Sequence, residues 1–558
     1  MKKRLIGILI VTGVTAWLGA QALAPSKPAS ELMPANALFY LEARNFAKVI
    51  SDWDGSPEKA AWFASSNYQS FQRSHLLTRL SEARKGFTDA AGLPEDAPLL
   101  TGIAGGESAL AFYDIGKLEF LYITQISSAR FAESAIGKIK QKFQARKAGG
   151  RDYYVLSKGD NTVAFALVGD RLILATNEDL IAGSLELLTG QKTDSLRQAA
   201  WFTEALAKAP PGAPPDVRFV ADLQKTARTP QFRSYWIQRN VSAVRQFATE
   251  VADLKFDTTN IREDRVFLRR KAKDNMADSE AAVADLLRYA SADAGFYQAS
   301  AKPAEDAVTA LLAQKLFGHG QALERQNERQ VAPDAPDGPS LAGEDDYETH
   351  VDVRQFAEDV TDAYAPLRAL ASNTDAVMQT AGARMTGVLP TIDTAVMLHG
   401  IAPWKAADVR QTLGQVAGPA WSVAPASLEW ADRNGAIELN GVTPLRFAID
   451  GNILVLSASP EFMARVISAR KTQSSAGATY AASFRHAQEF PGFARIAHLL
   501  DFPSIPQGQR VNDAAREPLF FSENIASLAT AMSRLDSVSI TTHDTGALVS
   551  EAVVYRRK

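Results

Sequence analysis

The sequence predicts an α+β fold with an N-terminal hydrophobic helix followed by two tandem related halves. Each half is expected to be a largely antiparallel sheet with helices packed on it. Three observations predict this fold: one stretch of sequence that occurs twice, short strand patterns that follow one another through tight turns, and helical patterns that precede or follow these meanders instead of alternating with single strands. In such folds the helices gather on one face of the sheet, and we expect that arrangement here.

The duplicated stretch is the strongest of these observations. Residues 165–182 read FALVGDRLILATNEDLIA, and residues 447–464 read FAIDGNILVLSASPEFMA. Both predict a strand, a tight turn at glycine, a second strand and a helix, because glycine accepts the positive φ that such turns need. Identical residues recur without a gap at Phe165/Phe447, Ala166/Ala448, Gly169/Gly451, Leu172/Leu454, Leu174/Leu456 and Ala182/Ala464.

The first half, residues 33–275, shows period-2 patterns typical of strands and longer amphipathic patterns typical of helices. The predicted strands are 37–41, 107–113, 118–126, 152–156, 162–168, 171–175 and 216–222, with a closing hairpin of 255–260 and 265–270. The predicted helical segments are 46–91, a basic amphipathic helix at 129–146, a helix from Asn177 to Gly190, and 235–253.

The second half, residues 276–558, repeats this order with more residues. An acidic, proline-rich segment at 330–348 accounts for most of the extra length, and its composition favours a flexible loop. The matched strands are 292–297, 394–401, 427–431, 436–440, 445–449, 496–501 (against 217–222), and a hairpin of 537–542 with 548–555, which sets Thr541-Thr542 against Thr258-Thr259. Helices are expected at 304–328, 353–370, 404–416 and 524–535.

A chain of 558 residues exceeds what one hydrophobic core usually serves, which agrees with two halves. Two arrangements stay open. The halves lie side by side about a pseudo-two-fold axis, or their sheets join edge to edge.

The N-terminus predicts a membrane segment. Lys2, Lys3 and Arg4 precede an uncharged run at residues 5–24, and positive residues before such a run keep the N-terminus in the cytoplasm. Residues 1–32 are therefore expected to be a signal peptide or membrane anchor with a spacer. A retained inner-membrane anchor and a signal cleaved after Ala22 both stay open, as does a buried cytosolic helix. We expect residues 25–558 to be extracytoplasmic, in the periplasm of the bacterial cell envelope.

Composition excludes several classes of function. Apolar residues make up 46% and charged residues 22%, as in ordinary globular proteins. A net charge of −3 gives no basic field of the kind that nucleic-acid binding needs. The absence of cysteine excludes disulfides, thiolate metal sites and cysteine nucleophiles.

The sequence predicts no catalytic, cofactor-binding or metal site. It lacks phosphate-binding loops, dinucleotide-binding fingerprints, His-Glu-x-x-His, Gly-x-Ser-x-Gly and EF-hand loops. Its seven histidines have no helical i,i+4 pairing that would place two imidazoles together. His399 and His498 are interpreted as strand residues and His543-Asp544 as a turn; the others are His75, His319, His350 and His486.

Three charged groups each allow two interpretations. Asp222 and Asp501 end corresponding strands. If the two carboxylates face each other, they form a joint acid/base or cation site. The favoured interpretation is that each carboxylate caps the turn or helix that follows its strand. An acidic loop is favoured over a calcium site for Asp334, Asp337, Glu344, Asp345 and Asp346. A solvated helix face is favoured over contact with anionic lipid for Lys138, Lys140, Lys142, Arg146, Lys147 and Arg151.

The opening at residues 33–41, MPANALFYL, and the run at 169–179, GDRLILATNED, give a resemblance. They resemble a family of uncharacterised bacterial proteins that join an N-terminal membrane segment to a large extracytoplasmic domain of unknown function. The second copy departs from the pattern at its entry strand, where Gly295 replaces an apolar residue. The resemblance implies an envelope location and carries over no catalytic residue.

These observations favour a non-enzymatic binding or scaffold protein of the bacterial envelope, with other envelope proteins as partners. One alternative is a carrier or sensor for an apolar, lipid-like ligand, which requires a continuous apolar cavity. A second is an envelope hydrolase, which requires histidines or paired carboxylates, such as Asp222 with Asp501, to converge in a cleft.

Overall fold

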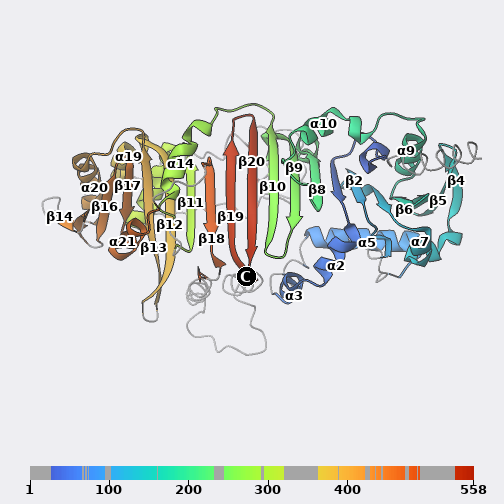
Figure 1. Ribbon diagram of the computed structural model, residues 1–558, viewed down its shortest axis with the longest axis horizontal. Helices are drawn as coiled ribbons and strands as arrows, with labels where there is room; N and C mark the ends of the chain where they lie inside the picture. The colour runs from blue at the N-terminus through green and yellow to red at the C-terminus, as the bar shows by residue number, and fades with distance from the viewer. Residues whose placement is uncertain are drawn as a thin grey trace, which may run out of the picture. The chain divides into compact units, whose positions relative to one another are not determined.

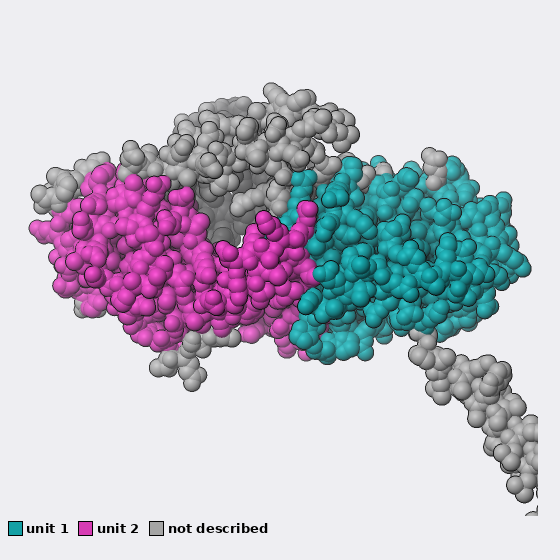
Figure 2. All heavy atoms as spheres, turned by 90° about the horizontal axis from the view of Figure 1, so that it is seen from above, with its two compact units in different colours: residues 1–54, 75–251 teal, residues 55–74, 252–558 magenta. Residues whose placement is uncertain are grey.

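The computed structural model is an α+β protein with extensive antiparallel pairing. It divides into two compact units, Met1–Asp54 with His75–Val251, and Gly55–Ser74 with Ala252–Lys558 (Figure 2). We call them unit 1 and unit 2. The structure describes residues 27–65, 68, 72, 75–94, 102–159, 161–230, 244–290, 294–318, 362–386, 389–421, 428–433, 435–441, 444–471, 477–486, 488–489 and 534–558.

Unit 1 contains an antiparallel sheet in the order β4-β5-β6-β7-β3-β2-β1-β8 (Figure 1). Its strands are β1 (Phe39–Ala43), β2 (Ser108–Asp114), β3 (Glu119–Gln125), β4 (Gln144–Ala148), β5 (Arg151–Lys158), β6 (Asn161–Val168), β7 (Arg171–Ala175) and β8 (Val217–Asp222). Its helices are η1 (Ala29–Leu32), α2 (Phe46–Asp54), α5 (His75–Ala91), α7 (Ser128–Glu133), α8 (Ala135–Lys138), η2 (Lys140–Lys142), α9 (Glu178–Thr189), η3 (Leu196–Gln198), α10 (Ala200–Ala207) and α11 (Leu223–Thr226).

Unit 2 contains the antiparallel order β14-β15-β16-β17-β13-β12-β11-β18-β19-β20-β10 (Figure 1). β9 (Phe247–Phe256) pairs with β10. The other strands are β10 (Asn260–Arg269), β11 (Phe296–Ala301), β12 (Thr374–Thr386), β13 (Leu389–Gly400), β14 (Glu429–Arg433), β15 (Ala436–Asn440), β16 (Leu445–Asp450), β17 (Ile453–Ser457), β18 (Tyr480–Phe484), β19 (Leu535–Asp544) and β20 (Leu548–Arg557). Its helices are α3 (Pro57–Phe63), η4 (Ala277–Ser279), α14 (Glu280–Leu287), α15 (Glu305–Phe317), η5 (Asp362–Leu367), α19 (Arg368–Ser372), α20 (Ala406–Trp421) and α21 (Pro460–Ser468).

Helices cover both faces of each sheet, so the expectation of one covered face is wrong. On β3, Leu121 and Ile123 pack into a cluster with α9 and α10, whereas Tyr122 packs with α5, α7 and α8 on the other face. In unit 2, α14 and α21 cover one face, and α15, α19 and α20 cover the other. The physical reason is that strands such as β7, with the sequence RLILA, are apolar on both sides and need cover on both.

The duplicated stretch forms the predicted elements in both places. β6 and β7 lead into α9, and β16 and β17 lead into α21. The two turns contain Gly169 at φ +63° and Gly451 at φ +61°, a region that glycine occupies without steric cost. Asn177 caps α9 by accepting a hydrogen bond from the Asp179 amide at 2.8 Å.

Parts of two segments that were predicted to be helical form strands in the structure. Residues 144–148, expected to end the helix at 129–146, form β4, and residues 247–253, expected to be helical, begin β9. Residues 144–148 read QARKA, all of them residues that favour helices in isolation, and residues 247–253 read FATEVAD, with two alanines and a glutamate. Pairing with β5 and β10 overrides that preference.

One positional prediction also needs correction. The β9–β10 hairpin turns at residues 257–259, so Thr258-Thr259 lies in a turn while Thr541-Thr542 lies inside β19. The predicted strand at residues 496–501, matched to 217–222, lies outside the described residues.

The predicted leader at residues 5–24 and the acidic segment at 330–348 also lie outside the described residues. Within the described part of the chain, no helix is long and apolar enough to cross a membrane. Residues 29–32, expected to belong to a spacer, form η1, which buries Leu32 against the core of unit 1.

The two matched phenylalanines of the duplicated stretch give a stability prediction. Phe165 and Phe447 are both 0% exposed, so alanine at either position removes a large buried ring and leaves a cavity. We expect Phe165→Ala and Phe447→Ala each to lower the free energy of unfolding by about 3–5 kcal/mol. Urea denaturation measures this, with Ile401→Ala, at an exposed side chain, as the control that changes little. A small effect at either phenylalanine would contradict the described packing.

Candidate functional site

A hollow of about 420 Å³ lies over the strands β11, β18, β19 and β20 of unit 2. We call it the sheet hollow. Most of its lining is polar, and its floor is the sheet itself. It is lined by Tyr297, Ser483, Arg485, Gln488, Asp536, Ser537, Ser539, Val554 and Arg556.

Strand register explains why these residues meet. Tyr297 pairs with Ser483, Ser483 with Ser539, and Ser539 with Val554, so the four side chains form one row across four strands. Arg556 pairs with Ser537 in the next row on the same face, because residues two apart in a strand point to the same side. Because serine side chains are short, the sheet surface is depressed in the middle of each row, and this depression is the hollow.

The hollow begins where the cover of the described helices ends. Ala299 and Ala301, on the same face of β11 as Tyr297, belong to the cluster that α14 and α21 cover. Among the described residues, none from β19 or β20 belongs to any of the four clusters of buried hydrophobic side chains. The sheet there has a face of serine, threonine and alanine instead.

The charge of the hollow is mainly basic, with Arg485 and Arg556 against Asp536. The Arg485 amide donates to the Gly295 carbonyl at 2.8 Å, which ties the residues after β18 to the entry of β11. Burial raises the pKa of Tyr297 although Arg485 acts in the opposite direction, so its hydroxyl stays protonated at neutral pH. Guanidinium and hydroxyl groups together suit carboxylate groups or peptide carbonyls as ligands.

The lining offers little for catalysis. It contains one carboxylate and no histidine among the residues that the structure describes. His486 lies beside the hollow, and its pKa is lowered by burial and then by Lys558, so it is neutral at pH 7. Its ring packs edge-on against Phe484, with 4.7 Å between centroids.

The carboxylate pair considered in the sequence is not brought together within the described residues. Asp222 caps α11, because its Oδ1 accepts from the Lys225 amide at 3.0 Å. Asp501 lies outside the described residues, with Asp334, Asp337, Glu344, Asp345 and Asp346.

The histidines that the structure describes do not cluster into a catalytic or metal site. His543 Nδ1 lies 2.9 Å from Glu280 Oε1, and His399 Nε2 lies 4.0 Å from Asp285 Oδ2. In the described part of the chain, no three His, Asp or Glu side chains lie close enough to hold a metal ion. His319, His350 and His498 lie outside the described residues.

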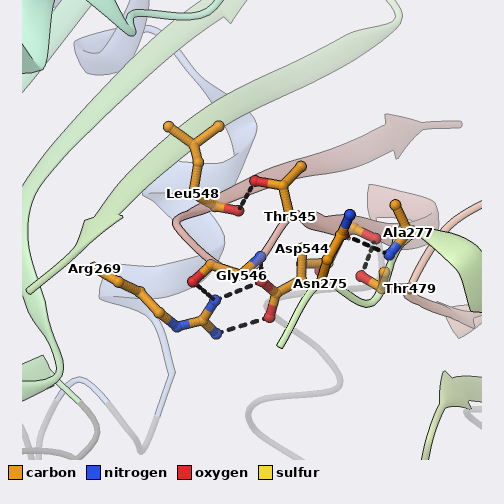
Figure 3. A network of polar contacts seen from close by, with 9 residues as sticks. Arg269, Asn275, Ala277, Thr479, Asp544, Thr545, Gly546 and Leu548 are labelled. Atoms are coloured by element: carbon orange, nitrogen blue, oxygen red, sulfur yellow. Dashed lines mark hydrogen bonds and ion pairs between the residues drawn. The ribbon is translucent and has the colours of Figure 1, made fainter. Parts of the chain in front are cut away.

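Asp544 has a structural role beside the turn between β19 and β20 (Figure 3). Its two oxygens accept from Arg269 at 2.5 and 2.7 Å, and its Oδ1 also accepts from the Gly546 amide at 2.8 Å. Thr545 Oγ1 donates to the Leu548 carbonyl at 3.2 Å across the same turn. Arg269 comes from β10, so this network fastens β10 to the β19–β20 turn.

A second hollow of about 300 Å³ lies in unit 1. It combines Glu42, Arg44 and Arg218 with a wall of Gly212, Pro214 and Pro215.

Sequence reasoning missed the sheet hollow. Its only signal was the alternation in residues 537–542, SVSITT, where small polar side chains replace the apolar ones of other strands. Arg485 and Arg556 gave no signal, because nothing in the local sequence at either position shows that the two side chains reach the same face of a sheet.

Comparison with known proteins adds little. No protein-family model matches the chain, and no curated protein matches it. Solved structures with local similarity include crystal form I of TP0453, at 11% identity over 45% of this chain and 82% of that chain, with a TM-score of 0.24. Crystal form III of TP0453 has 12% identity over 46% and 86%, with a TM-score of 0.25. Similarity this slight carries no argument about function.

The Arg269–Asp544 pair gives a pH prediction. Burial alone would raise the pKa of Asp544, but the Arg269 bonds and the Gly546 amide outweigh it and lower that pKa. The resulting stability is present above the unfolded-state pKa of about 3.9 and is lost as pH falls through the lower folded-state value. Unfolding free energies measured from pH 7 down to pH 2 should therefore fall less steeply in Asp544→Asn.

The same pair gives a matched comparison at pH 7. The side chains of Arg269 and Asp544 are 8% and 13% exposed, so removing the guanidinium leaves a poorly solvated carboxylate. We expect Arg269→Ala to cost about 3 kcal/mol. The exposed pair of Arg368 and Asp306 is the control, where Arg368→Ala should cost about 1 kcal/mol or less. Equal costs for the two variants would contradict the role of the network.

Proposed function

We propose that this protein is a membrane-tethered, extracytoplasmic binding or scaffold protein of the bacterial envelope that acts without catalysis. It recognises another envelope protein through the sheet hollow of unit 2. The observation that carries this proposal is the row of short serines with Arg485 and Arg556, on a sheet face beyond the cover of the described helices.

The chemistry of the hollow favours a protein segment as the ligand. A low floor of serine accepts a flat or extended segment, and its hydroxyls can bond to peptide groups. Arg485 and Arg556 supply charged donors for a carboxylate side chain or a chain terminus. We therefore propose a partner with acidic side chains at its contact surface.

The proposal includes two copies of one structural unit, residues 33–275 and 276–558, and the strand pairing supports it. Phe165 pairs with Leu174, and their counterparts Phe447 and Leu456 pair in the same way. The order β4-β5-β6-β7-β3-β2-β1-β8 in unit 1 has the same connections as β14-β15-β16-β17-β13-β12-β11-β18 in unit 2.

The last strands of the two proposed copies pair with each other. β10 and β20 are antiparallel, and Arg265 Nη1 donates to Glu551 Oε1 at 3.1 Å between register partners. Both strands belong to unit 2, so the end of the first proposed copy pairs within the sheet of that unit.

The two alternatives receive less support. A carrier for an apolar ligand needs an apolar cavity, whereas the sheet hollow is lined mainly by polar groups and three of the six residues that line the second hollow are charged. A hydrolase that uses Asp222 needs that carboxylate to be available, and it is engaged in capping α11. The leader at residues 5–24 supports the tether and the envelope location.

Photo-crosslinking in intact cells tests the binding proposal. A photoreactive amino acid at Ser539, on the floor of the hollow, should crosslink to a defined envelope protein. Arg556→Glu should lower that yield about tenfold or more, because it replaces a charged hydrogen bond with repulsion. Arg368→Glu, an exposed arginine on α19, is the matched control and should leave the yield unchanged. No crosslinked protein at Ser539, or the same loss in both variants, would contradict the proposal.

A further inference from the structure

We propose that one edge of unit 1 binds the anionic phospholipid surface next to the membrane segment and so orients unit 1 on the bilayer. This inference rests on the tether proposed above. The surface consists of β4, the residues before it and the start of β5, and we call it the basic edge. Its charged members are Lys138, Lys140, Lys142, Arg146, Lys147 and Arg151.

The basic edge is exposed along its whole length. All six basic residues are exposed, and β4 pairs only with β5 among the described strands. Lys140 Nζ lies 4.2 Å from the centre of the Tyr154 ring, so its position is defined by a cation–π contact. The predicted helix at 129–146 would have distributed these charges around a helix face, whereas the observed short helices and edge strand gather them at one end of the sheet.

Carboxylates compensate only part of this charge. Arg146 Nη1 lies 2.5 Å from Glu178 Oε1, and Lys147 Nζ lies 3.6 Å from Asp152 Oδ1. No carboxylate among the described residues pairs with Lys138, Lys140, Lys142 or Arg151. A net positive surface therefore remains.

The first described residue lies beside the tip of this edge. Lys27 Nζ donates to the Leu187 carbonyl at 3.2 Å and to the Leu188 carbonyl at 3.4 Å, in the last turn of α9. The turn between β4 and β5 rests on the same turn of α9. A Cβ on Gly149 would lie 2.8 Å from the Leu185 carbonyl oxygen and 2.7 Å from Thr189 Oγ1. Lys27 and the β4–β5 turn therefore both contact the last turn of α9.

The predicted membrane segment ends at Ala24, with Pro25 and Ser26 before Lys27. An extended chain spans at most about 3.6 Å per residue, so Lys27 can lie only roughly 11 Å from that end. The β4–β5 turn is then close to the bilayer surface. A Lys or Arg near an anionic leaflet contributes about fivefold in affinity, and this effect reaches about 10 Å at 0.1 M salt.

Protection of an edge strand is the other reason for lysine on β4. That explanation requires charge on the edge but no dependence on lipid. The lipid composition of the bilayer therefore separates the two explanations.

Energy transfer in nanodiscs tests the inference with the full chain. The chain has no cysteine, so Ala145→Cys, at an exposed position of β4, takes a single fluorophore. With acceptor-labelled lipid headgroups, we expect stronger transfer in discs of phosphatidylcholine with phosphatidylglycerol than in phosphatidylcholine alone, where only the tether keeps the edge near the bilayer. Raising the salt from about 0.1 M to about 1 M should lower the transfer, because the screening length shortens from about 10 Å to about 3 Å.

Charge reversal supplies the matched variants. Lys140→Glu with Lys142→Glu and Arg151→Glu should reduce the transfer in anionic discs to the level seen in phosphatidylcholine alone. The control carries the same change of charge at exposed residues of other unit 1 elements, Lys117→Glu with Lys208→Glu and Arg228→Glu, and should keep the strong transfer. Equal transfer in the two lipids, or an equal loss in the control, would overturn the inference.

Carbonate extraction of cell membranes separates this inference from the tether. If the protein stays in the membrane but its energy transfer is the same in both lipids, the tether is supported and only the lipid binding of the basic edge is contradicted. A chain that is released contradicts the tether. In that case the mature protein is mixed with vesicles of the same two lipids, and failure to float with the anionic vesicles overturns the basic edge as well.

Discussion

Two-sided burial is the constraint on which the rest of this structure depends. β7 in unit 1 and β17 in unit 2 place large apolar side chains on both faces of their sheets. Exposing either face to water would forfeit about 25 cal/mol for each Å² of apolar surface. Each sheet therefore lies between two helical layers.

The sheet hollow follows from the place where that constraint ends. From β11 to β20 the side chains on one face change from alanine in contact with α14 to serine, threonine and arginine. Short polar side chains on paired strands need no helix above them, since their hydroxyls remain satisfied by water or a ligand. Within the described part of the chain, the same sheet thus serves as a core in one region and presents a polar face in another.

The sequence predicted the local elements better than their surroundings. The Phe165 and Phe447 stretches, Asn177 as a cap and Gly190 as a C-terminal residue all follow from local chemistry. Residues 144–148 and 247–253 were mispredicted because their strand state depends on pairing with partners elsewhere in the chain. The second helical layer was missed although RLILA, an unbroken apolar run, was its signal.

The sheet hollow could not be predicted from the sequence, because it depends on strand register. Seventy residues separate Arg485 from Arg556, and only register across β18, β19 and β20 brings them to one face. The basic edge was recognised as a charge cluster, but its place beside Lys27 depends on the contact of both segments with α9.

The accessibility of the sheet face tests the central claim most directly. In this cysteine-free chain, the maleimide labelling rate of Ser539→Cys reports on the hollow, and that of Ala299→Cys reports on the same face under helical cover. The account predicts rapid labelling at 539 and negligible labelling at 299 in the folded protein. Slow labelling at both positions would show a covered face and would contradict the proposed binding surface.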